Sequence, residues 1–406
     1  MRYTFNNSKH MFSVRRAAAI LLLFALTLSL CGCDGSIYEN YHEIGDLQLV
    51  QTLGIDSDGE SMEVTISTGQ SLGDQPAAVI SRGGASIIAG MEALQDYSAK
   101  EELYFAHTRY ALLGDGAAKH ALPDFLDYIA RSTQLRMDVA LFVVKNGTAK
   151  NLITLSGKDS ADISESLSSV ERDVRRRGDS YAFTCREIIR SLAENGSALV
   201  CAVGASQTKD SVFSETGEVT ATPAGYAIIK NGALCGYLDA DAARGANILI
   251  NRAGYGAVTI KDGRGGILTT FPDNIDSKIS ADWGEDGHLK RIIADVELLA
   301  GIAELENGVD ITDEEFLNFA KTELAQKLKA WCVKTLKTSQ DLQADFLGLS
   351  ALLRKNYPRE FEKMPNTFCE ELSNAELVVN VRGEVRRTYD LEKPAALNGE
   401  DGKNAQ

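Results

Sequence analysis

The sequence predicts an α+β fold, in which mostly antiparallel sheets pack against helices in more than one domain. Short apolar segments end at Asp-Gly or Asn-Gly turns, as at 58–59 and 231–232, which is typical of β-hairpins. Between them lie segments with apolar residues three and four positions apart, which is typical of amphipathic helices. The 406 residues, 44% hydrophobic and 24% charged, suffice for two or three globular domains.

The N-terminal residues have the features of an export signal. Four basic and no acidic residues accompany an apolar run from Ala17 to Leu30, which is shorter than the roughly 20 residues of a spanning helix. Cys31-Gly32-Cys33 follows and resembles a bacterial lipobox, in which the cysteine after the cleavage site receives a lipid. We therefore predict a signal peptide at 1–32, lipid attachment at Cys33 and a polar membrane tether at 33–45.

The charge of the chain excludes some classes of partner. The formal charge is −15, and removal of the four basic residues in 1–32 would make it −19. A surface this negative disfavours nucleic acid and anionic lipid headgroups, so the membrane contact is assigned to the attached lipid. No C-x-x-C spacing occurs after Cys33, which argues against a disulfide framework or a zinc site.

Residues 46–204 are predicted to form an N-terminal α+β domain. Its apolar periodicity alternates between the strand and the helix pattern, and two helix starts have capping residues. The predicted elements, in chain order, are strands at 47–55 and 62–67, a helix capped by Ser86, a strand at 102–113, a helix around 122–129, a strand at 139–144, helices at 160–174 and after Thr184-x-x-Glu187, and a strand at 198–203.

A segment at 205–223 is rich in Ser, Thr, Gly and Glu and is the predicted linker. The C-terminal α+β region at 224–393 is predicted to form one domain or two subdomains, about 224–305 and 306–393, before a flexible tail at 394–406. Its predicted elements include a hairpin at 225–230 and 233–238, a long helix after Thr312-x-x-Glu315, a helix around 342–353 and a final strand at 376–388.

No segment has a complete catalytic motif. Gly69 to Gly73 matches G-x-S-x-G with Ser71 at its centre, but Asp74-Gln75-Pro76 follows where a nucleophile elbow needs a helix, so a loop is favoured over an esterase. The histidines lack the spacing of a metal site. The sequence therefore predicts no enzyme activity, no cofactor and no metal ion.

His107, Arg131 and Arg136 are the candidate partner-contact residues. His107 lies in a predicted strand, where a hydrogen-bonded, half-buried histidine is the alternative to a functional one. Arg131 and Arg136 flank the end of a predicted helix, where cations complement the helix dipole. The alternative is that their guanidinium groups reach a carboxylate or a carbonyl across a subunit interface.

Four stretches, together with the lipobox, resemble the Ger(x)C family of spore germination lipoproteins, the C subunits of nutrient germinant receptors. Their order agrees over roughly residues 33–390, but Asp34-Gly35 stands where the family usually has Trp and Asp, and the tether is longer. The stretches are Glu43–Leu47 with Leu53–Asp56; Leu103–His107 with Leu113-Gly114, Ile129–Arg131 and Leu135-Arg136; Gly225–Ile229 with Gly236–Leu238; and Ala344–Gly348 with Arg354 and Asn356–Pro358.

This resemblance implies an α+β protein tethered to the outer face of the spore inner membrane, with no catalytic residues. It also implies two integral-membrane partners, a multi-pass A subunit and a transporter-like B subunit that senses the nutrient. The alternative is a lipid-anchored solute-binding protein of the cell envelope, which would need two similar lobes around a cleft, whereas the two halves differ in pattern. A third hypothesis is an envelope hydrolase that uses Ser71 or His107.

Overall fold

The computed structural model describes residues 18, 20–21, 47–68, 78–98, 102–156, 163–207, 219–261, 266–305 and 314–386. Cys33, the tether at 33–45, the motif around Ser71 and the tail at 394–406 lie outside these ranges, as does the signal peptide apart from residues 18, 20 and 21. Within the described ranges, the helices are all too short or too polar to cross a membrane.

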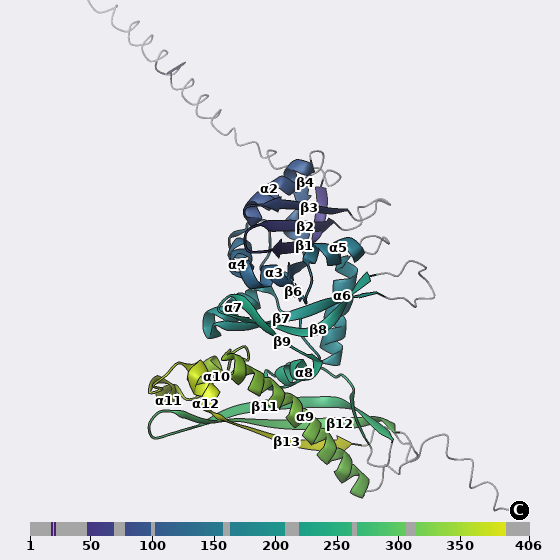
Figure 1. Ribbon diagram of the computed structural model, residues 1–406, viewed down its shortest axis with the longest axis vertical. Helices are drawn as coiled ribbons and strands as arrows, with labels where there is room; N and C mark the ends of the chain where they lie inside the picture. The colour runs from purple at the N-terminus through teal and green to yellow at the C-terminus, as the bar shows by residue number, and fades with distance from the viewer. Residues whose placement is uncertain are drawn as a thin grey trace, which may run out of the picture. The chain divides into compact units, whose positions relative to one another are not determined.

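The first sheet has the strand order β3-β2-β1-β5-β6-β7-β8-β9, with β4 also paired to β1 (Figure 1). Its outer pairs are antiparallel, whereas β1, β5, β6 and β7 run parallel to one another. The strands are β1 (Leu47–Ser57), β2 (Met62–Thr68), β3 (Val79–Gly84), β4 (Glu102–Tyr104), β5 (Tyr110–Gly114), β6 (Ala140–Val144), β7 (Ser197–Gln207), β8 (Val219–Lys230) and β9 (Ala233–Leu238).

Helices cover both faces of this sheet. In β6 every residue is buried, and its side chains alternate between two cores: Leu141 and Val143 pack in the core shared with α2, α4 and α7, whereas Phe142 and Val144 pack with α5 and α6. Burial on both faces is typical of parallel strands joined by helices. The helices are α2 (Ile87–Tyr97), α3 (Asp115–His120), α4 (Leu122–Arg131), α5 (Ala149–Ser156), α6 (Ile163–Arg177) and α7 (Cys185–Asn195).

The second sheet has the order β10-β11-β12-β13, antiparallel except for the parallel pair β12–β13. The long helix α9 crosses it and packs Leu324 and Leu328 into its core (Figure 1). The elements of this part are α8 (Ala240–Leu249), β10 (Val258–Lys261), β11 (Ile267–Trp283), β12 (Leu289–Leu305), α9 (Glu314–Leu342), α10 (Leu349–Asn356), α11 (Pro358–Glu362), α12 (Phe368–Asn374) and β13 (Glu376–Arg386).

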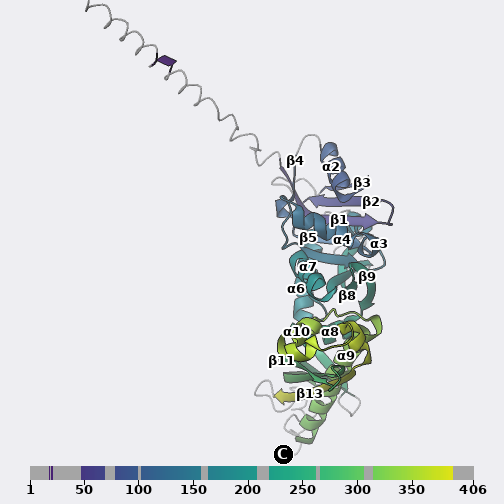
Figure 2. The same cartoon turned by 90° about the vertical axis from the view of Figure 1, so that its left-hand side faces the viewer.

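Helix α8 packs closely on α9, beside which it lies in both views (Figures 1 and 2). A Cβ atom on Gly245 would lie 2.2 Å from the carbonyl oxygen of Trp331, so only glycine allows the two helices to approach this closely. The hydroxyl of Thr335 on α9 donates to the carbonyl of Ala242 on α8 at 2.6 Å. A glycine contact and a buried hydrogen bond therefore fix this helix pair.

The predicted α+β class, the first hairpin, α2, α4, α7 with its capping box, and the hairpin of β8 and β9 are confirmed. The prediction of one strand over 102–113 is wrong. Residues Phe105–His107 form a 3₁₀ turn, closed by the hydrogen bond from the Thr108 N–H to the Phe105 carbonyl, between β4 and β5. The alternation of polarity suggested a strand because Leu103 and Phe105 lie two positions apart and are both buried. Phe105, however, is the first residue of the turn.

The sequence also did not predict the parallel centre of the first sheet, strand β3 or the helices α3, α5, α8, α11 and α12. The division of the chain at 205–223 stays a prediction, as do the subdomain bounds. Within that segment, β7 extends to Gln207, β8 begins at Val219, and the two strands pair in one sheet.

Candidate functional site

Residues from four separate segments line a shallow cavity of about 410 Å³ on the first-sheet part of the chain. His107, Arg109, Arg136 and Arg175 give it a basic lining, and we call it the arginine basin. It lies where β5 and β6 begin, because Tyr110 and Ala140 are the first residues of those strands and also line it.

The backbone of Arg109 is fixed between two strands while its side chain stays exposed. Its N–H donates to the carbonyl of Gln51 at 2.9 Å, and its carbonyl accepts from the N–H of Ala140 at 3.0 Å. The guanidinium carbon lies 5.4 Å from the centre of the Tyr110 ring. The sheet therefore fixes the backbone of Arg109 at the basin, and among the described residues its guanidinium group contacts the Tyr110 ring but forms no ion pair.

The other two arginines reach the basin from different elements. Arg136 follows α4 and donates to both carboxylate oxygens of Asp138, at 3.0 and 2.5 Å. Arg175 lies in the last turn of α6, 5.6 Å from the centre of the Tyr181 ring. Asp138 therefore holds Arg136 in place, whereas Arg175 packs against the aromatic face of Tyr181.

Of the two acidic side chains in the lining, Asp138 is paired with Arg136, and Glu171 also has a partner. The hydroxyl of the buried Tyr110 donates to Glu171 Oε2 at 3.2 Å. Burial is the main cause that raises the pKa of Tyr110, and the neighbouring Glu171 raises it further. Tyr110 therefore stays a neutral donor, and Glu171 stays tied to the wall of the basin.

The charge balance of the basin favours an anionic or carbonyl ligand. Within the described residues, Arg109 and Arg175 take part in no ion pair, and only Arg136 is neutralised, by Asp138. Exposed guanidinium groups on a rigid frame can form forked hydrogen bonds to carboxylates or to backbone carbonyls. The arrangement suits recognition of a protein surface rather than proton transfer.

The basin brings together two of the three predicted contact residues. His107 and Arg136 both line it, although His107 lies in the 3₁₀ turn and not in a strand as predicted. Arg131 lies elsewhere, on the exposed end of α4, where its Nε donates to Asp127 at 2.8 Å. That contact lowers the pKa of Asp127 and is an ion pair on the helix surface, so the role of Arg131 in a partner contact stays a prediction.

Sequence reasoning missed Arg109 and Arg175. Arg109 is only two residues after His107, but its position fitted the predicted strand and gave no separate sign of a functional role. Arg175 begins a run of three arginines whose position at the end of a helix is fully explained by the helix dipole. Only the fold, which places α6 beside the start of β5, gives these two residues a shared site.

The thiols that the structure describes are poorly suited to nucleophilic chemistry. Burial raises the pKa of Cys185, Cys201 and Cys332 to about 12 in each case, so each stays a thiol. In the described part of the chain, His, Cys, Asp and Glu side chains form no group of three that could hold a metal ion.

Two acidic residues in the motif stretches have structural roles. Asp56 at the end of β1 accepts from the N–H groups of Ala149 and Lys150 at 2.8 Å each, and so caps α5. The buried Asp345 accepts from the N–H groups of Leu349 and Ser350, also at 2.8 Å, and so caps α10. These motif positions therefore hold helices to the frame.

The structure is that of an α+β protein with two mixed sheets, and the arginine basin lies on its surface. Comparisons with known proteins agree with this class. The family described as "Spore germination protein N-terminal domain" matches residues 40–205, and the one described as "Spore germination B3/GerAC like, C-terminal" matches residues 224–389. The chain therefore belongs to the GerAC-like, or Ger(x)C, family of spore germination proteins.

Two individual proteins are similar over most of the chain. Spore germination protein KC of Bacillus subtilis (strain 168) is 25% identical over 422 aligned positions, which cover 92% of this chain and 96% of that protein. A crystal structure of the GerBC protein aligns with a TM-score of 0.51 and 18% identity, and covers 82% of this chain and 96% of that one. The second likeness supports the fold.

Proposed function

We propose that the chain is the lipid-anchored, non-enzymatic C subunit of a spore nutrient germinant receptor. In this proposal the Cys33 thiol carries the lipid, and the body lies at the outer face of the spore inner membrane. It assists assembly or signalling during germination by binding the integral-membrane A and B subunits. The observation that best supports the proposal is the pair of family matches, which run in order through 40–205 and 224–389.

The arginine basin is the proposed contact with those subunits. Within the described part of the chain the guanidinium groups of Arg109 and Arg175 form no ion pair, and Arg136 and His107 extend the same surface. Desolvated arginines are frequent in the energetically important part of protein interfaces, because the planar fork makes several directed hydrogen bonds. A carboxylate or a series of carbonyls on a membrane subunit would accept hydrogen bonds from the guanidinium groups of the basin.

The test is co-purification from spore membranes with a tagged chain. Wild type should capture a multi-pass subunit, and Cys33→Ala should reduce membrane recovery of the chain itself. Arg109→Glu combined with Arg175→Glu should reduce capture by at least about tenfold, as expected for lost and reversed interface charges. Arg359→Glu is the control, because Arg359 is also exposed but lies outside the basin, and it should capture as wild type does.

Two results would contradict the proposal. If wild type captures no multi-pass protein, the assignment of the chain to a receptor is wrong. Equal capture by the basin variant and by wild type would remove the basin as the contact while leaving the receptor assignment in place.

A further inference from the structure

A long groove follows strand β13 at the free edge of the second sheet. Its volume is about 1080 Å³, more than twice that of the arginine basin. Consecutive residues from Val379 to Glu384, and then Arg386, line it, so side chains from both faces of β13 take part. The groove therefore follows β13, and its lining extends onto the sheet through Asn274 of β11 and residues 297–299 of β12.

The edge of β13 offers unpaired backbone groups. On one side β13 pairs in parallel with β12 over its whole length, from Arg291–Glu376 to Gly301–Arg386, without a shift in register. On its other side, no strand among the described residues pairs with it. β13 is 11 residues long, and neither a proline nor a bulge interrupts it. A long, regular edge of this kind is a template for another strand.

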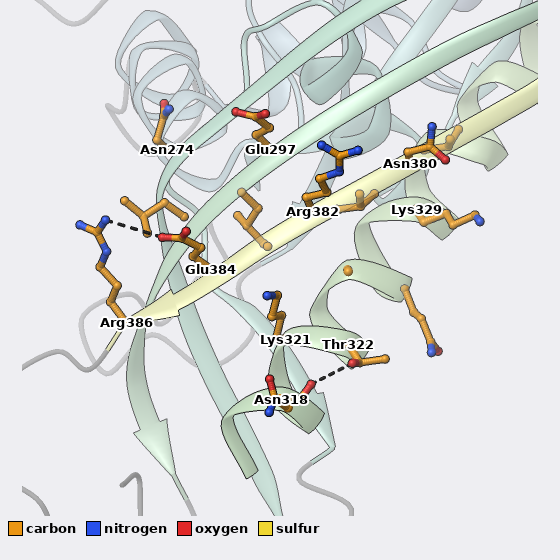
Figure 3. A pocket seen from close by; sticks show the side chains of 17 residues that line it. Asn274, Glu297, Asn318, Lys321, Thr322, Lys329, Asn380, Arg382, Glu384 and Arg386 are labelled. Atoms are coloured by element: carbon orange, nitrogen blue, oxygen red, sulfur yellow. Dashed lines mark hydrogen bonds and ion pairs between the residues drawn. The ribbon is translucent and has the colours of Figure 1, made fainter. Parts of the chain in front are cut away.

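Helix α9 forms the second wall of the groove. Its residues Asn318, Thr322, Ala325 and Lys329 follow one another at spacings of three and four, so they form one stripe along the helix, and Lys321 lies beside it. Figure 3 shows Lys321 and Lys329 on the α9 side and Arg382 with Glu297 on the other side of β13. An extended peptide paired with the free edge of β13 would therefore lie beside this stripe of α9.

The charge of the groove is opposite to that of the whole chain. Four basic side chains line it, with two acidic ones, Glu297 and Glu384, whereas the formal charge of the chain is −15. Arg386 has a distant ion pair with Glu384 at 3.7 Å. Lys321, Lys329 and Arg382 take part in no ion pair within the described ranges. The walls thus favour acidic side chains on a bound segment.

We propose that this groove, formed by β13 and α9, binds an extended acidic segment of another polypeptide chain, which adds a fifth strand to the sheet. Backbone hydrogen bonds to β13 would give affinity, and the lysines and arginines on the two walls would select glutamate or aspartate. The inference does not use the arginine basin, so it does not depend on the proposed contact there.

Two simpler explanations account for fewer features of the groove. Charged side chains on an edge strand discourage aggregation, which would explain Arg382 and Glu384 but not the matching stripe on α9. The chain's own residues 387–406 are another source of a strand. An immediate return after Arg386 would need a tight turn, and Arg387-Thr388 offers none of the Gly, Asn or Asp residues that such turns favour.

The test measures binding of a fluorescent peptide, Thr-Val-Glu-Val-Glu-Val-Glu-Thr, to the purified full chain by fluorescence anisotropy. Replacement of the central valine of the peptide by proline should weaken binding at least about tenfold, because a strand needs its N–H groups and extended backbone. Replacement of its glutamates by lysines should weaken binding by a similar factor. In hydrogen exchange, the acidic peptide should slow the amides of residues 379–386.

The protein variants separate the groove from general charge effects. Lys321→Glu combined with Lys329→Glu should weaken binding of the acidic peptide at least about tenfold. Lys337→Glu is the matched control, since it makes the same change at an exposed position of α9 that does not line the groove, and it should bind as wild type does. All three positions are exposed, so circular dichroism should show an unchanged fold.

Three outcomes would overturn the proposal. The first is equal binding of the proline and valine peptides, which would indicate a simple anion site. The second is equal binding by Lys337→Glu and by the Lys321/Lys329 double variant. The third is a strong gain in peptide affinity when the chain is truncated after Thr388, which would show that the chain's own C-terminal residues occupy the groove.

Discussion

The two sheets differ in how much of their surface other elements of the chain cover. In the first sheet, every residue of β6 is buried, and helices pack on both faces. In the second, β12 alternates between buried and exposed residues over much of its length, and the core lies on the face that α9 covers. The first sheet therefore serves as a rigid frame, whereas the second keeps one face and one edge open for contacts.

The largest expected effect of this difference is on the free energy of unfolding when each of two phenylalanines is replaced by alanine. Phe142 on β6 is fully buried, whereas Phe271 on β11 is 51% exposed. Phe142→Ala should lower the free energy of unfolding by about 3–5 kcal/mol, because it leaves a cavity between α5, α6 and the sheet. Phe271→Ala should change it by less than about 0.5 kcal/mol, as surface substitutions do. Urea denaturation measures both, and similar losses would refute the contrast between the sheets.

A smaller effect is expected at the carboxylate that ties α12 to β12. Glu371 is almost fully buried and accepts from Asn366 Nδ2 at 2.7 Å and from the Leu289 N–H at 3.1 Å, with His288 Nδ1 at 2.9 Å. Burial acts to raise the pKa of Glu371, but these hydrogen bonds outweigh it and lower the pKa. Glu371→Gln should therefore lower the free energy of unfolding at pH 7 by about 1–3 kcal/mol.

The sign of the pH dependence follows from that lowered pKa. The stabilisation by Glu371 is present above the unfolded-state pKa of 4.5 and is lost as the pH falls through the lower folded-state pKa. The difference between wild type and Glu371→Gln should therefore shrink in acid. A difference that stays constant between pH 7 and pH 3 would count against these contacts.

The smallest expected effect is at Asp56 in the first sheet, whose contribution to stability should depend on pH in the opposite direction. Burial is the main cause that raises the pKa of Asp56, against the N–H groups of Lys150 and Ala149 that lower it. The contribution of this group is therefore greatest below the unfolded-state pKa of 3.8 and declines as the pH rises through the higher folded-state pKa. Wild type should lose stability relative to Asp56→Asn over that range, measured by urea denaturation from pH 3 to pH 7. A wild type that instead gains stability relative to Asp56→Asn as the pH rises, as expected at Glu371, would contradict this prediction.

Local patterns predicted the elements that depend on neighbouring residues alone. The capping box of Thr184 and Glu187 and the Asn231-Gly232 turn both lie where the sequence placed them, because their hydrogen bonds and backbone angles are set within a few positions. The short helix α5 has no such box. A local cap is present, since the Thr148 hydroxyl accepts from the Asn151 N–H at 3.2 Å. The N–H groups before it are capped by Asp56, more than 90 residues earlier in the chain, and that contact could not be found locally.

The candidate site shows the same limit. His107 and Arg136 were found because each lies in a recognisable stretch, but Arg109 and Arg175 join them only through the order of strands β1, β5 and β6 and the position of α6. That order includes parallel pairs between strands far apart in the chain, which no hairpin signal reveals. Cys33 stays a prediction, since it lies outside the described residues.

The pairing of β7 with β8 has a consequence for the two matched regions of the chain. Most of β8 and all of β9 belong to the region matched at 224–389, yet they complete a sheet begun by the region matched at 40–205. A fragment that stopped at residue 207 would present β7 as an open, apolar margin and would tend to self-associate. Each matched region therefore leaves a sheet margin exposed when it is expressed without the other.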